Sequence, residues 1–324
     1  MKNRFKCFIA ALFALPMTGL IPLNASAQSW PSRPITYIYP FPPGGPSEAP
    51  LRAAATEASR LLGQPVVFEN RPGANSRLSI VAMRNAPPDG YLISAVIDGV
   101  LTSQPLLDPE FKFQPLRDYA PVALQVEATL RLMGPTSLPF KDIKGLIEYA
   151  KANPRKLNVA VTIGASSHII AERIREAAGI EVTMVGYKGS SQSYVDLVAG
   201  RVDLVMGSDK ALVDAGKLIA LATTGRERWA GLPNVPTLVE SGIPVVTSLW
   251  YGVIAHPNTP PEIVAKLNNV FNAAVRTPGF NSKRVETSAY TAMAAVTPEG
   301  MAAFIRSEMA ALEPVIRKAG IKME

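Results

Sequence analysis

The stretch from Tyr37 to Arg52, YIYPFPPGGPSEAPLR, combines residue types that can bind an anion. A β-type run at 35–39 leads into a proline-rich turn with two glycines, and a helical pattern begins at Ser47 or Glu48. The first amides of a helix lack internal partners and carry partial positive charge, so this arrangement can bind an anionic group through backbone N–H groups. A turn that only joins a strand to a helix is the alternative that the residues leave open.

A second turn of the same kind lies near the middle of the chain. Residues 162–168, TIGASSH, separate an expected strand at 156–163 from an expected helix at 167–178. The hydroxyls and amides of this turn can point to the same place as those of the first turn. We favour contact with a ligand, although Ser166 or Ser167 could serve simply as an N-cap.

A third strand-to-helix turn, residues 187–191 (YKGSS), also leaves a helix N-terminus open. Tyr187 suits the wall of a binding site because it offers an aromatic face and a hydroxyl. Lys188 could balance a carboxylate, but a lysine in a loop is usually solvated. We therefore expect ligand contact from Tyr187 rather than from Lys188.

Residue types that support catalysis or metal binding are scarce. The chain has no G-x-S-x-G nucleophile turn and no G-x-G-x-x-G dinucleotide motif. Its single cysteine, Cys7, precedes the expected mature chain, and its two histidines are His168 and His256. His168 and Glu172 share one face of a helix without a further ligand nearby in the sequence. We predict no enzymatic activity, no metal site and no cofactor.

Residues 1–27 have the composition of a secretory signal peptide. Three basic residues precede an apolar run at 8–23, and small residues at 25–27 would allow cleavage before Gln28. We therefore expect export to the periplasm. A mature chain beginning there has no cysteine, so its core must be large enough to be stable without disulfides.

The charge pattern gives little support for nucleic-acid binding. The formal net charge is +7, and it falls to about +4 without the three basic residues of the expected signal peptide. Lysines and arginines are scattered, with no basic block and no interleaved aromatic residues. A mild positive balance suits an anionic small molecule.

Strand and helix patterns alternate along most of the chain, which favours parallel sheets covered by helices. The N-terminal part contains expected strands at 35–39, 65–68 and 91–97, the last ended by Asp98 and Gly99. An extended run at 122–133 leads into a second series of elements, whose first helix is expected at 138–152. A chain of this length usually exceeds one core, so we expect two lobes.

Several motifs together resemble those of one known family. In chain order they are WPSRPITYIYPFPPGGPSEAPLR, ENRPGA (69–74), PPDGY (87–91), YKG (187–189) with VDL (202–204), and GLPNVPTLVESGIP (231–244) running into SLWYG (248–252). This order is similar to that of the Bug-type solute receptors, the substrate-binding proteins of tripartite tricarboxylate transporters. The motifs span almost the whole expected mature chain.

The resemblance implies an α/β, two-lobe type II periplasmic-binding-protein fold. Each lobe would be a largely parallel sheet flanked by helices, with the ligand cleft between them. Lobe 1 would comprise residues 28–127 and 247–324, and lobe 2 residues 128–246. The resemblance also implies a small organic carboxylate as ligand, the permease subunits of a membrane transporter as partner, a monomeric receptor, and closure over the ligand.

The three turns and the resemblance together give a set of expected ligand-binding residues. They are Phe41, Pro43, Gly44, Gly45, Pro46, Ser47, Thr162, Ala165, Ser166, Ser167, His168, Tyr187 and Asp209. Asp209 would face an anionic ligand only through water or through an amine of that ligand.

The sequence also departs from the family pattern around the expected pocket. Glu48 stands where the family usually has aspartate, Asn75 and Arg77 replace part of a glycine-rich run, and Gln104 stands where asparagine is typical. These departures affect the rim of the pocket, so no particular carboxylate can be transferred from a relative. A ligand sensor that feeds a signalling protein and an exported enzyme on the same fold stay as alternatives.

Overall fold

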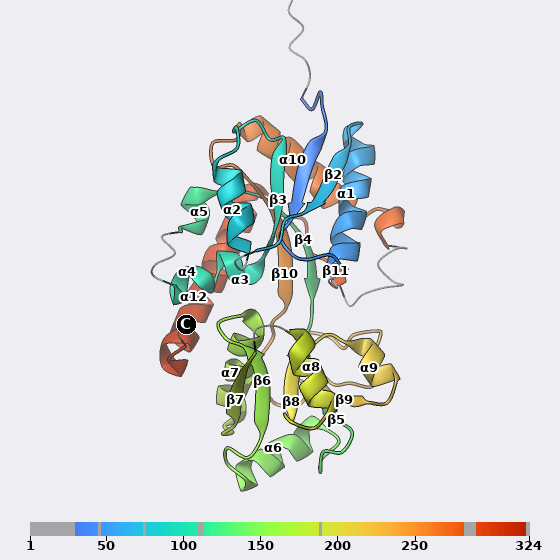
Figure 1. Ribbon diagram of the computed structural model, residues 1–324, viewed down its shortest axis with the longest axis vertical. Coiled ribbons are helices and arrows are strands. Elements are labelled where there is room, and N and C mark those ends of the chain that lie inside the picture. Colours follow the sequence, from blue (N-terminus) through green and yellow to red (C-terminus); the bar gives the residue numbers. More distant parts are fainter. Residues whose placement is uncertain are drawn as a thin grey trace, which may run out of the picture.

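Two β-sheets form the cores of two α/β lobes, which lie one above the other in Figure 1. This computed structural model describes residues 30–44, 47–73, 76–108, 113–187, 190–281 and 290–321. The sheet of lobe 1 has the order β11-β4-β10-β3-β1-β2, and that of lobe 2 the order β7-β6-β8-β5-β9. The predicted two-lobe α/β architecture is confirmed, and both sheets contain parallel and antiparallel pairs.

Lobe 1 combines segments from both ends of the chain. Its strands are β1 (Ile35–Tyr39), β2 (Val66–Asn70), β3 (Leu92–Ile97), β4 (Ala120–Ala128), β10 (Leu249–Ala255) and β11 (Tyr290–Ala292). Its helices are α1 (Glu48–Leu62), α2 (Arg77–Arg84), α3 (Asp98–Leu101), α4 (Gln104–Leu107), α5 (Pro115–Asp118), α10 (Pro261–Ala274) and α12 (Pro298–Ala319).

Lobe 2 is formed by one continuous part of the chain. Its strands are β5 (Arg131–Pro135), β6 (Asn158–Thr162), β7 (Thr183–Tyr187), β8 (Leu204–Gly207) and β9 (Leu218–Thr223). Its helices are α6 (Ile143–Ala152), α7 (Ser166–Ala178), α8 (Ser190–Val198) and α9 (Lys210–Asp214). Within the described ranges of both lobes, no helix is both long and apolar enough to cross a membrane.

The first strand and helix show why the sequence folds in this way. Strand β1 is buried along almost its whole length, as expected for an inner parallel strand covered on both faces. Helix α1 buries Leu51 and a set of alanines, whose small side chains allow it to pack closely. It ends at Gly63, which has a φ of 67° and accommodates the left-handed cap at little cost.

The parallel strands direct their carboxyl ends towards the gap between the lobes. In lobe 1, β1 pairs in parallel with β2 and β3, so all three strands end at one edge. In lobe 2, β6 runs parallel to β8, and β5 lies antiparallel on the other side of β8. Arg131 at the start of β5 pairs with Gly207 at the end of β8. Helix N-termini and loops from both lobes therefore gather at the facing edges.

Two crossings of the backbone connect the lobes, and they are hydrogen-bonded to each other. The first passes directly from β4 into β5, and the second returns through residues 224–248 to β10. The Leu130 amide donates to Oγ1 of Thr224 at 3.0 Å, and the Thr224 amide donates to the Leu130 carbonyl at 2.9 Å. A further bridge joins Lys318 of α12 to Glu176 of α7 at 2.6 Å.

Two boundaries differ from the sequence-based prediction for identifiable reasons. The helix predicted at 138–152 begins only at Ile143, because the Asp142 carboxylate caps it by accepting from the Gly145 amide at 2.7 Å. The extended run predicted at 122–133 is divided into β4 and β5 at the crossing between the lobes. Strand β3 ends at Ile97, as predicted, and Asp98 and Gly99 then begin the short helix α3.

Candidate functional site

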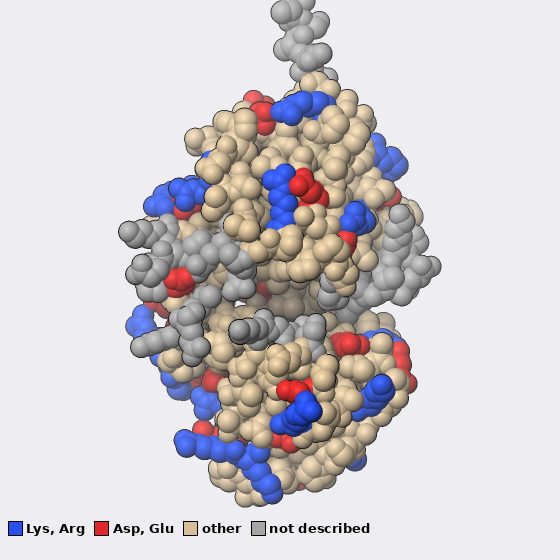
Figure 2. All heavy atoms as spheres, viewed as in Figure 1, with Lys and Arg blue, Asp and Glu red and all other residues tan. Residues whose placement is uncertain are grey.

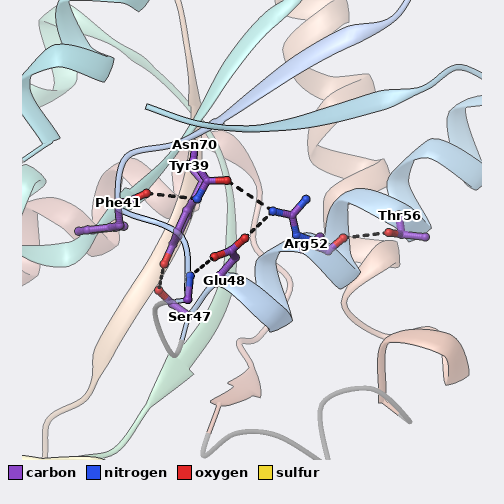
Figure 3. A network of polar contacts seen from close by, with 8 residues as sticks. Tyr39, Phe41, Ser47, Glu48, Arg52, Thr56 and Asn70 are labelled. Carbon is purple, nitrogen blue, oxygen red and sulfur yellow. Dashed lines mark hydrogen bonds and ion pairs between the residues drawn. The ribbon is translucent and has the colours of Figure 1, made fainter. Parts of the chain in front are cut away.

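The turn between β1 and α1 is held in place by its own polar side chains (Figure 3). The Gly44 amide donates to Oε2 of Glu48 at 2.7 Å, and Glu48 also forms an ion pair with Arg52. The pKa of Glu48 is lowered, first by the hydrogen bond from Arg52 and then by the Gly44 amide. The Gly44 amide, which the sequence suggested as a donor to a ligand, therefore already donates its hydrogen bond to the Glu48 carboxylate. Gly45 and Pro46 lie outside the described residues.

Aromatic side chains form a wall beside this turn. The half-buried Phe41 ring lies 5.2 Å from that of Tyr39 and 6.3 Å from that of Tyr251, whose own ring is 5.8 Å from that of Tyr290. The Tyr39 hydroxyl shares a 2.8 Å hydrogen bond with Oγ of the buried Ser47. Burial raises the pKa values of Tyr39 and Tyr251, and it raises that of Tyr290 to about 12, so these hydroxyls stay protonated at neutral pH.

The base of the first turn is hydrogen-bonded to lobe 1, whereas its tip is exposed. The side-chain amide of Asn70 donates to the Phe41 carbonyl at 3.2 Å, which ties the turn to the end of β2 (Figure 3). Pro43 and Gly44 are exposed, and Gly44 has a φ of 86°. The turn is thus fixed at its base while its tip stays open to solvent.

The turn between β6 and α7 faces lobe 1. Gly164 has a φ of 73°, and Ala165 is the N-cap of α7, with no side chain able to accept a hydrogen bond. Ser166 and Ser167 are therefore the first residues of α7 and not its N-cap, and their amides have no partner within the helix. Thr162 ends β6 and is half-buried. Contact between this turn and a ligand stays a prediction.

Ser166 contacts a residue that the sequence reasoning missed. Its hydroxyl donates to Oδ2 of Asp98 at 2.9 Å, and the Ser103 hydroxyl donates to the Gly164 carbonyl at 3.4 Å. Both hydrogen bonds join lobe 1 to lobe 2. Asp98 follows β3 directly at the edge that carries the first turn, and this position after a buried parallel strand is the signal that could have identified it.

Asp98 lies in a nearly dry environment between the lobes. Its side chain is 7% exposed, and its Oδ1 atom is buried without a hydrogen-bond partner. Burial raises the pKa of the Asp98 carboxyl to about 7, and the Ser166 hydroxyl offsets this only in part. A cavity of about 20 Å³, room for about one water molecule, adjoins Asp98 and is also lined by Ser103, Arg173 and Glu308.

Three other predicted site residues are engaged in hydrogen bonds within lobe 2. His168 is buried, its Nδ1 accepts from the Gly164 amide at 3.3 Å, and burial lowers its pKa. The Tyr187 hydroxyl donates to Asp196 at 2.8 Å. Asp209 is the N-cap of α9 and accepts from the Leu212 amide at 3.2 Å. These side chains position the turns of lobe 2 around the gap.

Arg131 is a second polar residue that the sequence reasoning missed. It begins β5 at the crossing between the lobes, and its side chain is almost completely buried. The terminal nitrogens donate to the backbone carbonyls of Thr129 and Ser208, each at 2.9 Å. The alternation of apolar residues around it gave no sign that an arginine would be buried here.

The remaining departures noted in the sequence lie only partly within the described residues. Asn75 and the side chain of Arg77 fall outside them, whereas Gln104 begins α4 and is half-buried. Figure 2 shows a hollow between the lobes, with lysine and arginine side chains scattered over both lobes on this face. Within the described residues, no group of three or more histidine, cysteine, aspartate or glutamate side chains could hold a metal ion.

Comparison with known proteins identifies the family. Residues 51–321 match the model of the tripartite tricarboxylate transporter family receptor. The chain belongs to this receptor family. It is 32% identical over 317 residues to Protein BugT of Bordetella pertussis, with 95% of each chain covered. The predicted Bug-type resemblance is therefore confirmed.

Solved structures of similar proteins support the family and the fold of this receptor. Rpa4515 of R. palustris, solved with adipate, has a TM-score of 0.79 and 32% identity, covering 90% of this chain and 99% of that chain. MatC of Rhodopseudomonas palustris, solved with bound malate, has a TM-score of 0.74 and 28% identity, covering 88% and 99%. The receptor thus shares its two-lobe architecture with proteins that hold carboxylates.

Proposed function

We propose that this receptor binds a small organic carboxylate between its lobes in the periplasm and delivers it to the permease subunits of a tripartite tricarboxylate-type transporter. The observation that carries the proposal is the N-terminus of α7, where the amides of Ser166 and Ser167 have no partner within the helix and where Ser166 meets Asp98 of lobe 1. Helix N-termini bind anions through unpaired amides and the helix dipole. The relatives solved with adipate and malate support the same class of ligand.

The proposed mechanism is capture followed by closure, without a chemical step. An incoming carboxylate would accept hydrogen bonds from the amides of Ser166 and Ser167. Closure about the two crossings would remove water and strengthen each of these interactions. We propose a monomer acting as a binding protein and not as an enzyme, with residues 1–27, which lie outside the described residues, as its signal peptide.

A thermal-shift screen of the purified protein tests this function. The panel contains tricarboxylates, dicarboxylates, aromatic acids, amino acids and nicotinate, with the matching amides and alcohols as uncharged controls. A ligand present at about 100 times its dissociation constant adds roughly 2.7 kcal/mol to the free energy of unfolding, which raises Tm by several degrees. The proposal predicts such a shift with at least one acid and none with the controls. A panel in which no acid raises Tm would contradict it.

A further inference from the structure

Arg131 is a buried cation whose charge is not neutralised by any carboxylate in the described part of the chain. It is 1% exposed, and both hydrogen bonds of its terminal nitrogens go to backbone carbonyls. Its Nε atom is buried with no acceptor. A guanidinium has five N–H donors, so these two bonds leave several of them unused. Burying an unpaired charge costs several kcal/mol, so this position needs a physical reason.

The partners of the guanidinium place it in the gap between the lobes. Thr129 belongs to the first crossing, and Ser208 lies just beyond the end of β8. The ring of Trp229, from the returning crossing, covers the guanidinium, and its centroid lies 4.5 Å from Cζ of Arg131. Burial lowers the pKa of the Arg131 guanidinium to about 10. The group therefore stays positively charged at neutral pH.

The strand register sets the spacing between Arg131 and the turn that precedes α7. Strands β6, β8 and β5 are neighbours, and their ends at this edge lie in one row. Two interstrand spacings, roughly 10 Å, separate the end of β6 from the start of β5. An anionic group at the α7 N-terminus and another at Arg131 would thus lie roughly 10 Å apart along the same edge of the sheet.

We propose that Arg131 binds a second carboxylate of the ligand, so that this receptor selects dicarboxylates over monocarboxylates. The inference rests on the proposed function, in which the α7 amides bind the first carboxylate. The planar guanidinium matches a carboxylate through two parallel hydrogen bonds, and the unused Nε donor provides one of them. The stacked Trp229 ring and the two backbone carbonyls fix the orientation of the Arg131 guanidinium before the ligand binds.

Isothermal titration with matched pairs of acids tests the assignment. Butanedioate is compared with butanoate, and hexanedioate with hexanoate, for the wild type, Arg131→Gln and Arg131→Lys. Arg228→Gln is the matched control, because Arg228 is exposed and pairs with Glu240 on the surface of the returning crossing. The free energy of unfolding of each variant is measured in parallel by denaturant melts.

The expected result is a loss confined to dicarboxylates. Arg131→Gln should weaken dicarboxylate binding at least about 30-fold, because a buried charge pair is broken, and should change monocarboxylate binding less than about 3-fold. Arg131→Lys should lose an intermediate amount of dicarboxylate affinity, since lysine keeps the charge but lacks the planar guanidinium with its paired donors. It also provides the test if the glutamine variant does not fold. Arg228→Gln should bind as the wild type does.

Other outcomes would overturn the inference and leave the proposed function standing. If Arg131→Gln keeps its dicarboxylate affinity but has a lower free energy of unfolding, Arg131 only stabilises the crossing between the lobes. Equal losses for both kinds of acid would place Arg131 at the first carboxylate instead. A wild type that binds no acid at all would contradict the proposed function itself, which is a separate result.

Discussion

The carboxylate of Asp98 and the hydroxyl of Ser166 come from different lobes and meet at 2.9 Å. Arg131 lies at the crossing of the same two lobes with its charge unpaired by any described carboxylate. Buried charged groups are rare unless a partner or a ligand compensates them. At the scale of residues, the side chains of Asp98 and Arg131 therefore carry more functional information than the exposed tip of the first turn.

Replacing Asp98 with asparagine should change how stability depends on pH. The pKa of the Asp98 carboxyl in the folded state, about 7, lies above the ordinary value of 3.8, so the folded state holds this proton more tightly than the unfolded state does. The stability that this group contributes is present below about pH 4 and is lost as the pH rises through 7. The loss is at most about 1.4 kcal/mol per pH unit.

Denaturant melts of the wild type and Asp98→Asn between pH 4 and 8 check this expectation. The free energy of unfolding of the variant minus that of the wild type should increase from pH 4 to 7 and stay constant above pH 7. Asp89→Asn is the control, because Asp89 lies on the surface, where it pairs with Arg33. A constant difference between Asp98→Asn and the wild type over this range would contradict the raised pKa.

At the scale of elements, the order of strands and helices was largely predictable, whereas the polar contacts were not. Apolar periodicity and the proline-rich turn with its two glycines are local signals, and they located β1, α1 and the turn between them. The charged residues of the gap could not be found in this way, because their burial depends on pairing between β5 and β8 and between the lobes. The N-cap Asp142 is a local signal that the prediction overlooked.

The first turn allows a prediction about the backbone alone. Gly44 has a φ of 86°, and a Cβ atom there would meet nothing within 4 Å. Gly44→Ala should therefore lower the free energy of unfolding by about 1–2 kcal/mol through backbone strain, without any clash. Gly44→Asn should cost less, because asparagine tolerates the left-handed region.

Denaturant melts of both Gly44 variants measure this cost. Equal stability of Gly44→Ala and the wild type would show that the turn relaxes freely and is not fixed by Glu48 and Asn70. Titration of the same variants with an acid found in the thermal-shift screen would show whether the shape of this turn also affects binding.

At the scale of the whole molecule, the lobes are joined by the two crossings and by contacts around α7, among them an apolar cluster of Leu107, Ile169, Ile316 and Ile321. The two crossings are bonded at Leu130 and Thr224, and the contacts of Asp98 with Ser166 and of Lys318 with Glu176 bridge the gap elsewhere. Two rigid sheets joined by short segments are typical of proteins that close about a hinge. We expect the bend to occur at the crossings, leaving the strand pairing inside each lobe unchanged.

We expect the two lobes to close on a carboxylate that binds between them. Small-angle X-ray scattering of the purified protein, with and without the acid that gives the largest thermal shift, measures this closure. The radius of gyration should be smaller with the acid, saturating at the concentration that saturates the thermal shift, and should not change with the matching amide. An unchanged radius of gyration at saturating acid would contradict closure around a ligand held between the lobes.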